Sequence, residues 1–282
     1  MSRQPTFSSF RALVSRCRAF PVDRVVLSEY APLCMTAGEG EPIVAVHGLA
    51  GSFDLLTPVI PLLAERRQVI AYQLRGEERG ARGGYTFRDL ADDLVELMDR
   101  LGLDRPVVAG LSFGAGVALE AALAYPDRVR ALVLQGAAAR LRLTFLLRTA
   151  LEILSALDLP STSELVNRAF RMLFQRHCDD EEAVEFVVRR CWHTPQPSMV
   201  HRLEMVGRFN VQPRLRRLTA PALVVAGDED IIVDPRRSAK LARRLPDARF
   251  RLLTNAGHMA FLTQPDAFAD LIASFLDDLP CP

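Results

Sequence analysis

The stretch PVVAGLSFGAGVALEAALA (106–124) decides the fold. It begins as an apolar run with the length of a buried strand and continues as a helical pattern that ends before Pro126. Between the two, GLSFG (110–114) fits the pattern G-x-S-x-G, in which a serine occupies a strained strand-to-helix turn. Such a turn exposes the serine hydroxyl, and the amino end of the helix directs partial positive charge at it. Ser112 is therefore either a turn residue or a nucleophile, and the rest of the chain must decide which.

Short apolar runs alternate with helical patterns on both sides of this stretch. The runs are nearly free of polar residues, as expected of parallel strands that helices cover on both faces. A capping box of Thr86 and Asp89 opens the clearest helix. The order predicts an α/β fold with a doubly wound, mostly parallel sheet. Its predicted strands are 43–47, 68–72, 106–110, 130–136, 222–227 and 250–255, its other helices are 114–124, 235–244 and 265–277, and an antiparallel hairpin of 25–30 and 32–38 is expected at one edge.

The alternation stops between about residues 137 and 216, where every pattern is helical. We expect this insertion to form a cap over the carboxyl edge of the sheet, because open α/β sheets bind ligands there. The α/β core would then comprise 23–136 and 217–282. Residues 1–22 are expected to form an N-terminal arm, although their arginines and serines would also suit a transit peptide. The apolar residues that would dock the arm are Phe7, Phe10, Leu13 and Val14.

Composition narrows the functional classes. The 282 residues are 49% hydrophobic and 24% charged with a net charge of +1, which is typical of a soluble globular protein and disfavours nucleic-acid binding. No run approaches the length of a membrane span. The five cysteines lack metal or redox spacing, so we expect reduced thiols and a cytoplasmic location, with a Cys178–Cys191 pair left open. The expected partner is a small-molecule substrate, and the protein would be a monomer or homodimer.

A serine hydroxyl is a poor nucleophile unless a base activates it and a third group holds the base. His258 follows the last predicted strand, and several acids follow the strand that ends at Gly227. Because the carboxyl ends of parallel strands share one edge of a sheet, both can reach Ser112. The candidate bases are His47, His177, His193, His201 and His258, and the candidate acids are Asp228, Glu229, Asp230 and Asp234.

With these residues, the chain resembles the α/β-hydrolase fold superfamily from about residue 24 to 277. The resemblance implies the chain order serine, acid, histidine, with Ser112 as nucleophile and His258 as base. The acid would be Asp230, the last residue of a G-x-x-D loop, with Asp228 as the alternative. The residues that follow Gly257-His258 also resemble the C-terminal sequence pattern of the family, although Thr263 stands where the family often has glutamate.

The stretch HGLAGS (47–52) resembles the family's oxyanion loop. The backbone N–H groups of Leu49 and Phe113 would then bind the oxyanion, with His47, Gly48, Gly110 and Gly114 supporting the motif. QLRGEERGA (73–81) resembles a further family loop, but Gln73 and Glu77 replace its usual aspartate and histidine. These departures leave the subfamily open.

The resemblance implies a serine hydrolase, such as a carboxylesterase, lactonase or thioesterase, that needs no cofactor and no metal. It would cleave an ester-like bond of a small to medium, largely apolar acyl substrate through an acyl-enzyme. Arg189, Arg190 and Trp192 suit a carbon–carbon bond hydrolase, but Met259 stands where those enzymes usually have tryptophan. A perhydrolase and a non-catalytic binding protein also remain open. The apolar cap residues that could line the pocket are Leu146, Leu147, Leu151, Leu154 and Phe170.

Overall fold

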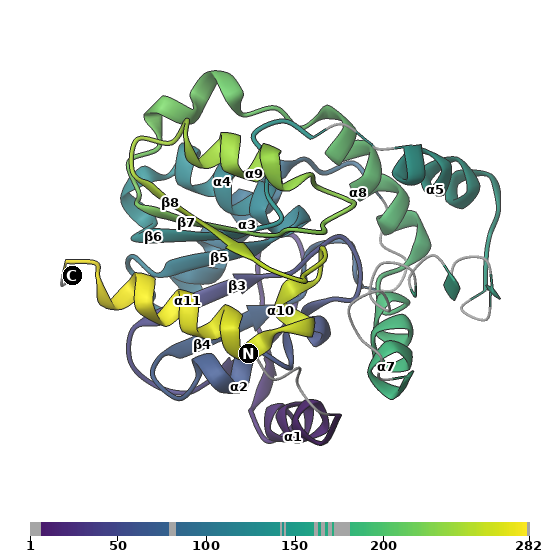
Figure 1. The fold of residues 1–282 in the computed structure, drawn as a ribbon, viewed down its shortest axis with the longest axis horizontal. Helices are drawn as coiled ribbons and strands as arrows, with labels where there is room; N and C mark the ends of the chain where they lie inside the picture. Colours follow the sequence, from purple (N-terminus) through teal and green to yellow (C-terminus); the bar gives the residue numbers. More distant parts are fainter. Residues whose placement is uncertain are drawn as a thin grey trace.

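The apolar runs of the sequence become the strands of one eight-stranded sheet with helices on both faces (Figure 1). The computed structural model describes residues 7–78, 83–141, 143, 145–160, 163–164, 167–168, 171 and 181–280. The strand order in the sheet is β1-β2-β4-β3-β5-β6-β7-β8. The strands are β1 (Val22–Arg24), β2 (Leu33–Ala37), β3 (Pro42–Val46), β4 (Gln68–Tyr72), β5 (Val107–Leu111), β6 (Ala131–Gln135), β7 (Ala222–Gly227) and β8 (Ala248–Leu253).

The sheet is mostly parallel, which confirms the predicted fold class. Strands β3 to β8 pair in parallel, and β2 pairs antiparallel with β4. The predicted edge hairpin exists, but the position of its first strand was wrong, because β1 is Val22–Arg24 and not 25–30. The reason is local: the N–H of Leu27 donates to the carbonyl of Tyr30, so this stretch is the turn of the hairpin.

Helices cover both faces of the sheet, and the buried apolar side chains form one cluster on each face. Figure 1 shows α3, α4 and α9 above the sheet and α2 and α11 below it. The predicted helices are confirmed within a few residues at each end. The helices are α1 (Phe7–Cys17), α2 (Ile60–Leu63), α3 (Phe87–Arg100), α4 (Phe113–Ala124), α5 (Phe145–Ala156), α7 (Glu181–Cys191), α8 (Gln196–Arg208), α9 (Pro235–Ala242), α10 (Ala260–Thr263) and α11 (Pro265–Asp277).

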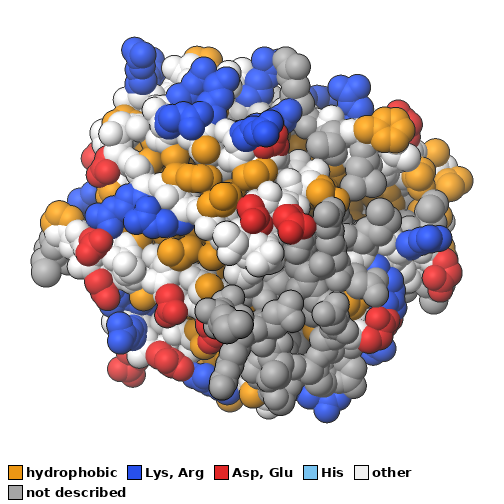
Figure 2. Space-filling view, in the orientation of Figure 1, with side chains coloured by type: hydrophobic (Ala, Val, Ile, Leu, Met, Phe, Trp, Pro, Cys, Tyr) orange, Lys and Arg blue, Asp and Glu red, His pale blue; other side chains and the backbone are white. Residues whose placement is uncertain are grey.

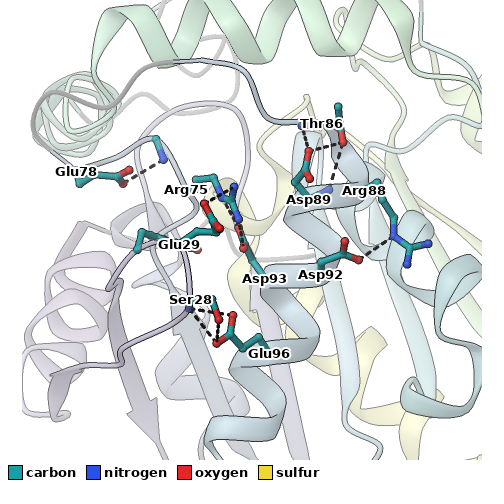
Figure 3. Close-up of polar contacts among 12 residues, drawn as sticks. Ser28, Glu29, Arg75, Glu78, Thr86, Arg88, Asp89, Asp92, Asp93 and Glu96 are labelled. Atoms are coloured by element: carbon teal, nitrogen blue, oxygen red, sulfur yellow. Dashed lines mark hydrogen bonds and ion pairs between the residues drawn. The ribbon is translucent and has the colours of Figure 1, made fainter.

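Helix α3 begins at the predicted capping box and fixes the loop that follows β4 (Figure 3). The Thr86 hydroxyl accepts from the N–H of Asp89, and the Asp89 carboxylate accepts from the N–H of Thr86. Further along the helix, the nearly buried Asp93 carboxylate pairs with the guanidinium of Arg75. This ion pair attaches the loop after β4 to the helix, close to the residues described below.

The segment from 137 to 216 contains α5, α7, α8 and the short 3-10 helix Gln212–Arg217. Among its described residues there is no strand, only an isolated bridge between Arg140 and Asn210. Figure 1 shows α5, α7 and α8 together beyond one end of the sheet. Apolar side chains are exposed over α5 at the right of Figure 2, where Phe145 is 88% exposed. Of the predicted pocket residues, Leu147, Leu151 and Leu154 are half-buried, whereas the side chains of Leu146 and Phe170 lie outside the described part.

The N-terminal residues form α1, whose Leu13, Val14 and Cys17 side chains are buried. The side chains of Phe7 and Phe10 lie outside the described part. Burial raises the pKa values of Cys17, Cys34 and Cys191 to about 12, so these three cysteines are unreactive free thiols. Cys178, the partner that the sequence leaves open for Cys191, lies outside the described residues, as does Cys281. No helix in the described ranges is long and apolar enough to cross a membrane.

Candidate active site

Ser112 occupies the turn between β5 and α4 in a strained conformation. Its φ of 54° and ψ of −110° lie in a region that residues other than glycine rarely adopt. The turn is held because the N–H of Ser112 donates to the carbonyl of Gln135 on the neighbouring strand, at 2.8 Å. Helix α4 starts at the next residue, so its unpaired N–H groups and its positive end lie beside the serine.

The glycines on both sides of Ser112 are required by close backbone contacts. The G-x-S-x-G pattern predicts that a side chain at either glycine would collide with a neighbouring strand. This is so for Gly114, where a Cβ atom would lie 2.1 Å from the carbonyl oxygen of Val46 at the end of β3. For Gly110 the prediction was wrong about the partner. A Cβ there would meet the backbone of Gly114 and Ala115, so Gly110 allows α4 and not a strand to approach.

These contacts give a stability prediction. We expect Gly114→Ala to lower the free energy of unfolding by about 3 kcal/mol or more, because the added methyl meets backbone that cannot move aside. Gly102→Ala is the matched control: its φ is +67° but nothing lies within 4 Å of the added Cβ, so it should cost only about 1 kcal/mol. Urea denaturation of both variants measures the difference. Equal losses in the two variants would contradict the packing argument.

The structure brings Ser112, His258 and Asp230 into one hydrogen-bonded row. Nε2 of His258 lies 2.7 Å from Oγ of Ser112, and Nδ1 lies 2.8 Å from Oδ2 of Asp230. A carboxylate can only accept a hydrogen bond, so Nδ1 carries a proton and donates to Asp230. In the neutral imidazole Nε2 is then an acceptor, and the Ser112 hydroxyl donates to it. This is the arrangement that lets an imidazole remove the proton of an attacking hydroxyl.

Asp230 is kept ionised although it is buried. Burial alone would raise its pKa, but the imidazole of His258 and the N–H groups of Ile232 and Val233 stabilise the carboxylate and lower the pKa overall. The other acids of this region lie elsewhere. Asp228 is exposed and accepts from the N–H of Ala256, and Asp234 caps the start of α9.

Two residues that the sequence did not single out support His258. The buried amide of Gln135 at the end of β6 donates to the carbonyl of His258 at 2.8 Å. A Cβ on the next residue, Gly136, would lie 2.9 Å from Cε1 of the imidazole, so only glycine leaves the ring its space. The sequence signal that could have identified these two residues is a single polar residue followed by glycine at the end of an apolar run.

The loop after β3 lies against the serine turn. A Cβ built on Gly48 would be 3.9 Å from the Cβ of Ser112, so this loop and the turn are in contact. Phe113 is the first residue of α4, where the N–H has no partner within the helix. Leu49 follows Gly48 in this loop and Phe113 follows Ser112, so the two predicted oxyanion donors belong to two segments that are in contact.

A buried charged cluster lies behind this loop, and the sequence did not predict it. Arg202 of α8 and Glu77 are 0% and 1% exposed and 3.0 Å apart. Glu77 is also 3.0 Å from Nε2 of His47, whose Nδ1 is 2.9 Å from the carbonyl of Gly48. Burial would raise the pKa of Glu77, but His47 and Arg202 lower it to about 2. The departure at Glu77 thus has a partner, Arg202, that comes from the helical segment.

The remaining histidines and the Arg189–Trp192 stretch have other partners. His193 lies 2.6 Å from Asp54, and His201 lies 2.7 Å from the carbonyl of Tyr85, whereas His177 is not among the described residues. The Trp192 indole donates to Asn167 at 2.7 Å. Arg189 faces Glu185, and the guanidinium of Arg190 stacks 4.2 Å from the ring centre of Phe186. In the described ranges, no group of three or more His, Cys, Asp or Glu side chains could hold a metal ion.

Comparison with known proteins agrees with this architecture. The family model described as alpha/beta hydrolase fold matches residues 41–265. A provisionally named carbamate hydrolase, RutD, of Azorhizobium caulinodans is 30% identical over 249 residues, which make up 86% of this chain and 93% of that protein. The 2-hydroxymuconate semialdehyde hydrolase of Pseudomonas sp. strain CF600 is 29% identical over 253 residues, or 85% of this chain and 88% of that protein.

A solved structure shows the same fold. The thermophilic esterase of Thermogutta terrifontis superposes with a TM-score of 0.79 over 91% of this chain and 98% of that one, at 23% identity. At this level of identity the likeness concerns the fold alone.

Proposed function

Because the chain belongs to the α/β-hydrolase fold family, we propose that it is a serine hydrolase that forms an acyl-enzyme on Ser112. The single observation that supports this most strongly is the hydrogen-bonded row of Ser112, His258 and Asp230. Relatives named as hydrolases support hydrolytic activity in general. The substrate class that we propose is an ester-like bond with a small to medium, largely apolar acyl group.

In the first half of the proposed reaction, Oγ of Ser112 attacks the carbonyl carbon of the substrate while Nε2 of His258 takes the hydroxyl proton. Asp230 holds the ring and stabilises the imidazolium that forms, because its carboxylate stays ionised. The N–H groups of Leu49 and Phe113 bind the oxyanion of the tetrahedral intermediate. When the bond to the leaving group breaks, His258 donates its proton to that group.

In the second half, water attacks the acyl-enzyme and His258 acts as base again. The new tetrahedral intermediate collapses, the proton returns to Oγ of Ser112, and the acid is released. Every proton in the cycle passes through Nε2 of His258, and all the groups involved belong to this chain. We also propose that 137–216 is a cap over this site, because Thr194 and Arg202 from this segment contact residues 49–51.

A carbon–carbon bond hydrolase is the second candidate, and one relative is named as a hydrolase of 2-hydroxymuconate semialdehyde. Such an enzyme would use the same row of residues. The side chains that favoured this alternative in the sequence are engaged with neighbours of their own: Trp192 with Asn167, Arg189 with Glu185 and Arg190 with Phe186. We therefore place ester-like substrates first.

A substrate panel tests the proposal. It contains p-nitrophenyl esters from acetate to octanoate, a lactone, an acyl-thioester, an aryl carbamate and a vinylogous diketone. We expect turnover of at least one short or medium oxygen or thiol ester at a kcat/KM at least ~10³-fold above that of Ser112→Ala, since the row of three acts as a unit. Turnover of the diketone alone would favour the carbon–carbon bond hydrolase. Binding without turnover of any compound would favour a non-catalytic role.

A further inference from the structure

The charged cluster behind the loop after β3 connects the helical segment to the proposed oxyanion site. Nη1 of Arg202 donates to the carbonyl of Leu49 at 2.9 Å and to Oε1 of Glu77 at 3.0 Å. Nη2 donates to the carbonyl of Arg75 at 3.1 Å. The guanidinium also lies 5.5 Å from the ring centre of Phe113. A single side chain of α8 thus contacts both Leu49 and Phe113, the two residues that we propose as oxyanion donors.

Burial makes this contact rigid. The Arg202 side chain is fully buried, and both of its Nη atoms donate hydrogen bonds, whereas Nε has no hydrogen-bond partner among the described residues. Glu77 supplies the balancing charge, and it lies between Arg202 and His47. Loss of Glu77 would leave an unpaired buried cation, so the two residues act as one unit.

The direction of the Leu49 backbone follows from the contact. Peptide units are planar, so each residue turns only about φ and ψ. The carbonyl of Leu49, which Arg202 holds, shares its planar unit with the N–H of Ala50, whereas the N–H of Leu49 shares a unit with the carbonyl of Gly48, which lies 2.9 Å from Nδ1 of His47. Because Glu77 lies against both Arg202 and His47, the cluster holds the peptide units on both sides of Leu49 and so restricts the rotation of its N–H. On the far side of the loop, the N–H of Gly51 donates to the buried hydroxyl of Thr194 at 3.0 Å, so the same segment holds the loop at two points.

We propose that Arg202, held by Glu77, is a positioning residue that orients the Leu49 N–H for binding of the oxyanion. This inference rests on the proposed function. It makes helix α8 a part of the acyl-transfer machinery and not only a cover. It also explains why Glu77 departs from the histidine that is usual at this place in the family: the carboxylate balances the arginine.

The test compares Arg202→Met, Glu77→Gln and the double variant with a matched control, Arg214→Met. Arg214 forms a bidentate ion pair with Glu120 on α4, at 2.8 and 2.6 Å, and does not touch the oxyanion loop. For each protein we would measure thermal stability, kcat and KM for a p-nitrophenyl ester, and the inhibition constant of a trifluoromethyl ketone. This ketone forms a tetrahedral adduct with the serine and so reports on oxyanion binding.

For Arg202→Met we expect kcat to fall and the inhibition constant to rise by the same factor of about 10 to 100, with KM changed by less than about threefold. The double variant should recover much of the lost stability, because no buried charge is left unpaired, but it should not recover kcat. Arg214→Met should lose stability and keep both kinetic values. If the double variant regains wild-type kcat and inhibitor affinity, Arg202 is merely structural and the proposal is wrong.

Arg202→Lys keeps the test decisive if Arg202→Met does not fold. The lysine retains a positive charge near Glu77 but cannot reproduce the planar fork that reaches both Leu49 and Arg75. We expect the same paired change in kcat and inhibitor affinity, and wild-type values would overturn the proposal. Failure of the proposed function has a different signature: the wild-type protein itself would show no turnover and no adduct with the ketone, and the inference would fall with it.

Discussion

Ser112→Ala is expected to lower kcat for a p-nitrophenyl ester by about 10⁴- to 10⁶-fold, the largest effect of any single substitution in this protein. The variant removes the atom that would form the acyl-enzyme, and neither His258 nor the oxyanion donors can replace a bond-forming nucleophile. The structure should survive, because alanine is smaller than serine and the strained turn is held by backbone bonds such as that to Gln135. Steady-state kinetics with the most active ester of the panel measure the effect.

The control for this variant is Ser238→Ala. Ser238 is also a buried serine, and its hydroxyl donates to the carbonyl of Ala137 at 2.7 Å. Its loss should lower the free energy of unfolding by about 1 kcal/mol and leave kcat unchanged. A Ser112→Ala variant that keeps a substantial part of wild-type turnover would show that the reaction does not pass through this hydroxyl.

Asp230→Asn is expected to lower kcat by about 10³- to 10⁴-fold with little change in fold. The amide is the same size, and its oxygen can still accept from the N–H groups of Ile232 and Val233. It no longer stabilises an imidazolium, however, and its NH₂ group can donate to Nδ1 and so favour the tautomer of His258 that cannot take the serine proton. The measurement is kcat for the same ester, together with circular dichroism to show that the fold is retained.

Asp228→Asn is the matched control, because Asp228 was the alternative acid in the sequence. Its side chain is exposed and accepts from the N–H of Ala256, which an asparagine oxygen can do as well. We expect kcat to stay within about twofold of the wild type, as for most surface substitutions. If Asp228→Asn instead abolishes turnover and Asp230→Asn does not, the assignment of the acid is reversed.

The fold could be predicted from the sequence because its strands are short, apolar and separated by regular helices. The runs 68–72 and 222–227 became β4 and β7 without a change of boundary, and the capping box at Thr86 and Asp89 formed as predicted. The edge of the sheet was harder to predict. Polar and apolar residues alternate over 25–30 as they would in a strand, but this segment forms a turn. Its pairing with β2 begins only at the pair of Arg24 and Leu33, and alternation in a sequence does not show where pairing begins.

The row of Ser112, His258 and Asp230 could be anticipated because each residue follows a strand of one parallel sheet, and the carboxyl ends of such strands meet. The residues that support the row could not. Gln135 and Gly136 have a local signal, a polar residue and a glycine at the end of an apolar run, but it does not indicate that they contact His258. Arg202 lies in a helical segment whose packing one sequence does not reveal. The sequence showed that Glu77 departs from the family's loop pattern, but it did not show that this carboxylate pairs with Arg202, which is 125 positions away.

Labelling with a fluorophosphonate, followed by mass spectrometry of the proteolysed adduct, tests the central claim most directly. The reagent bonds only to a hydroxyl that a neighbouring base activates, so it asks whether His258 and Asp230 act on Ser112 in solution. We expect one phosphonyl group per chain, attached to Ser112, and no labelling of Ser112→Ala. An unlabelled wild-type protein, or a label on another residue at the same rate, would contradict the claim.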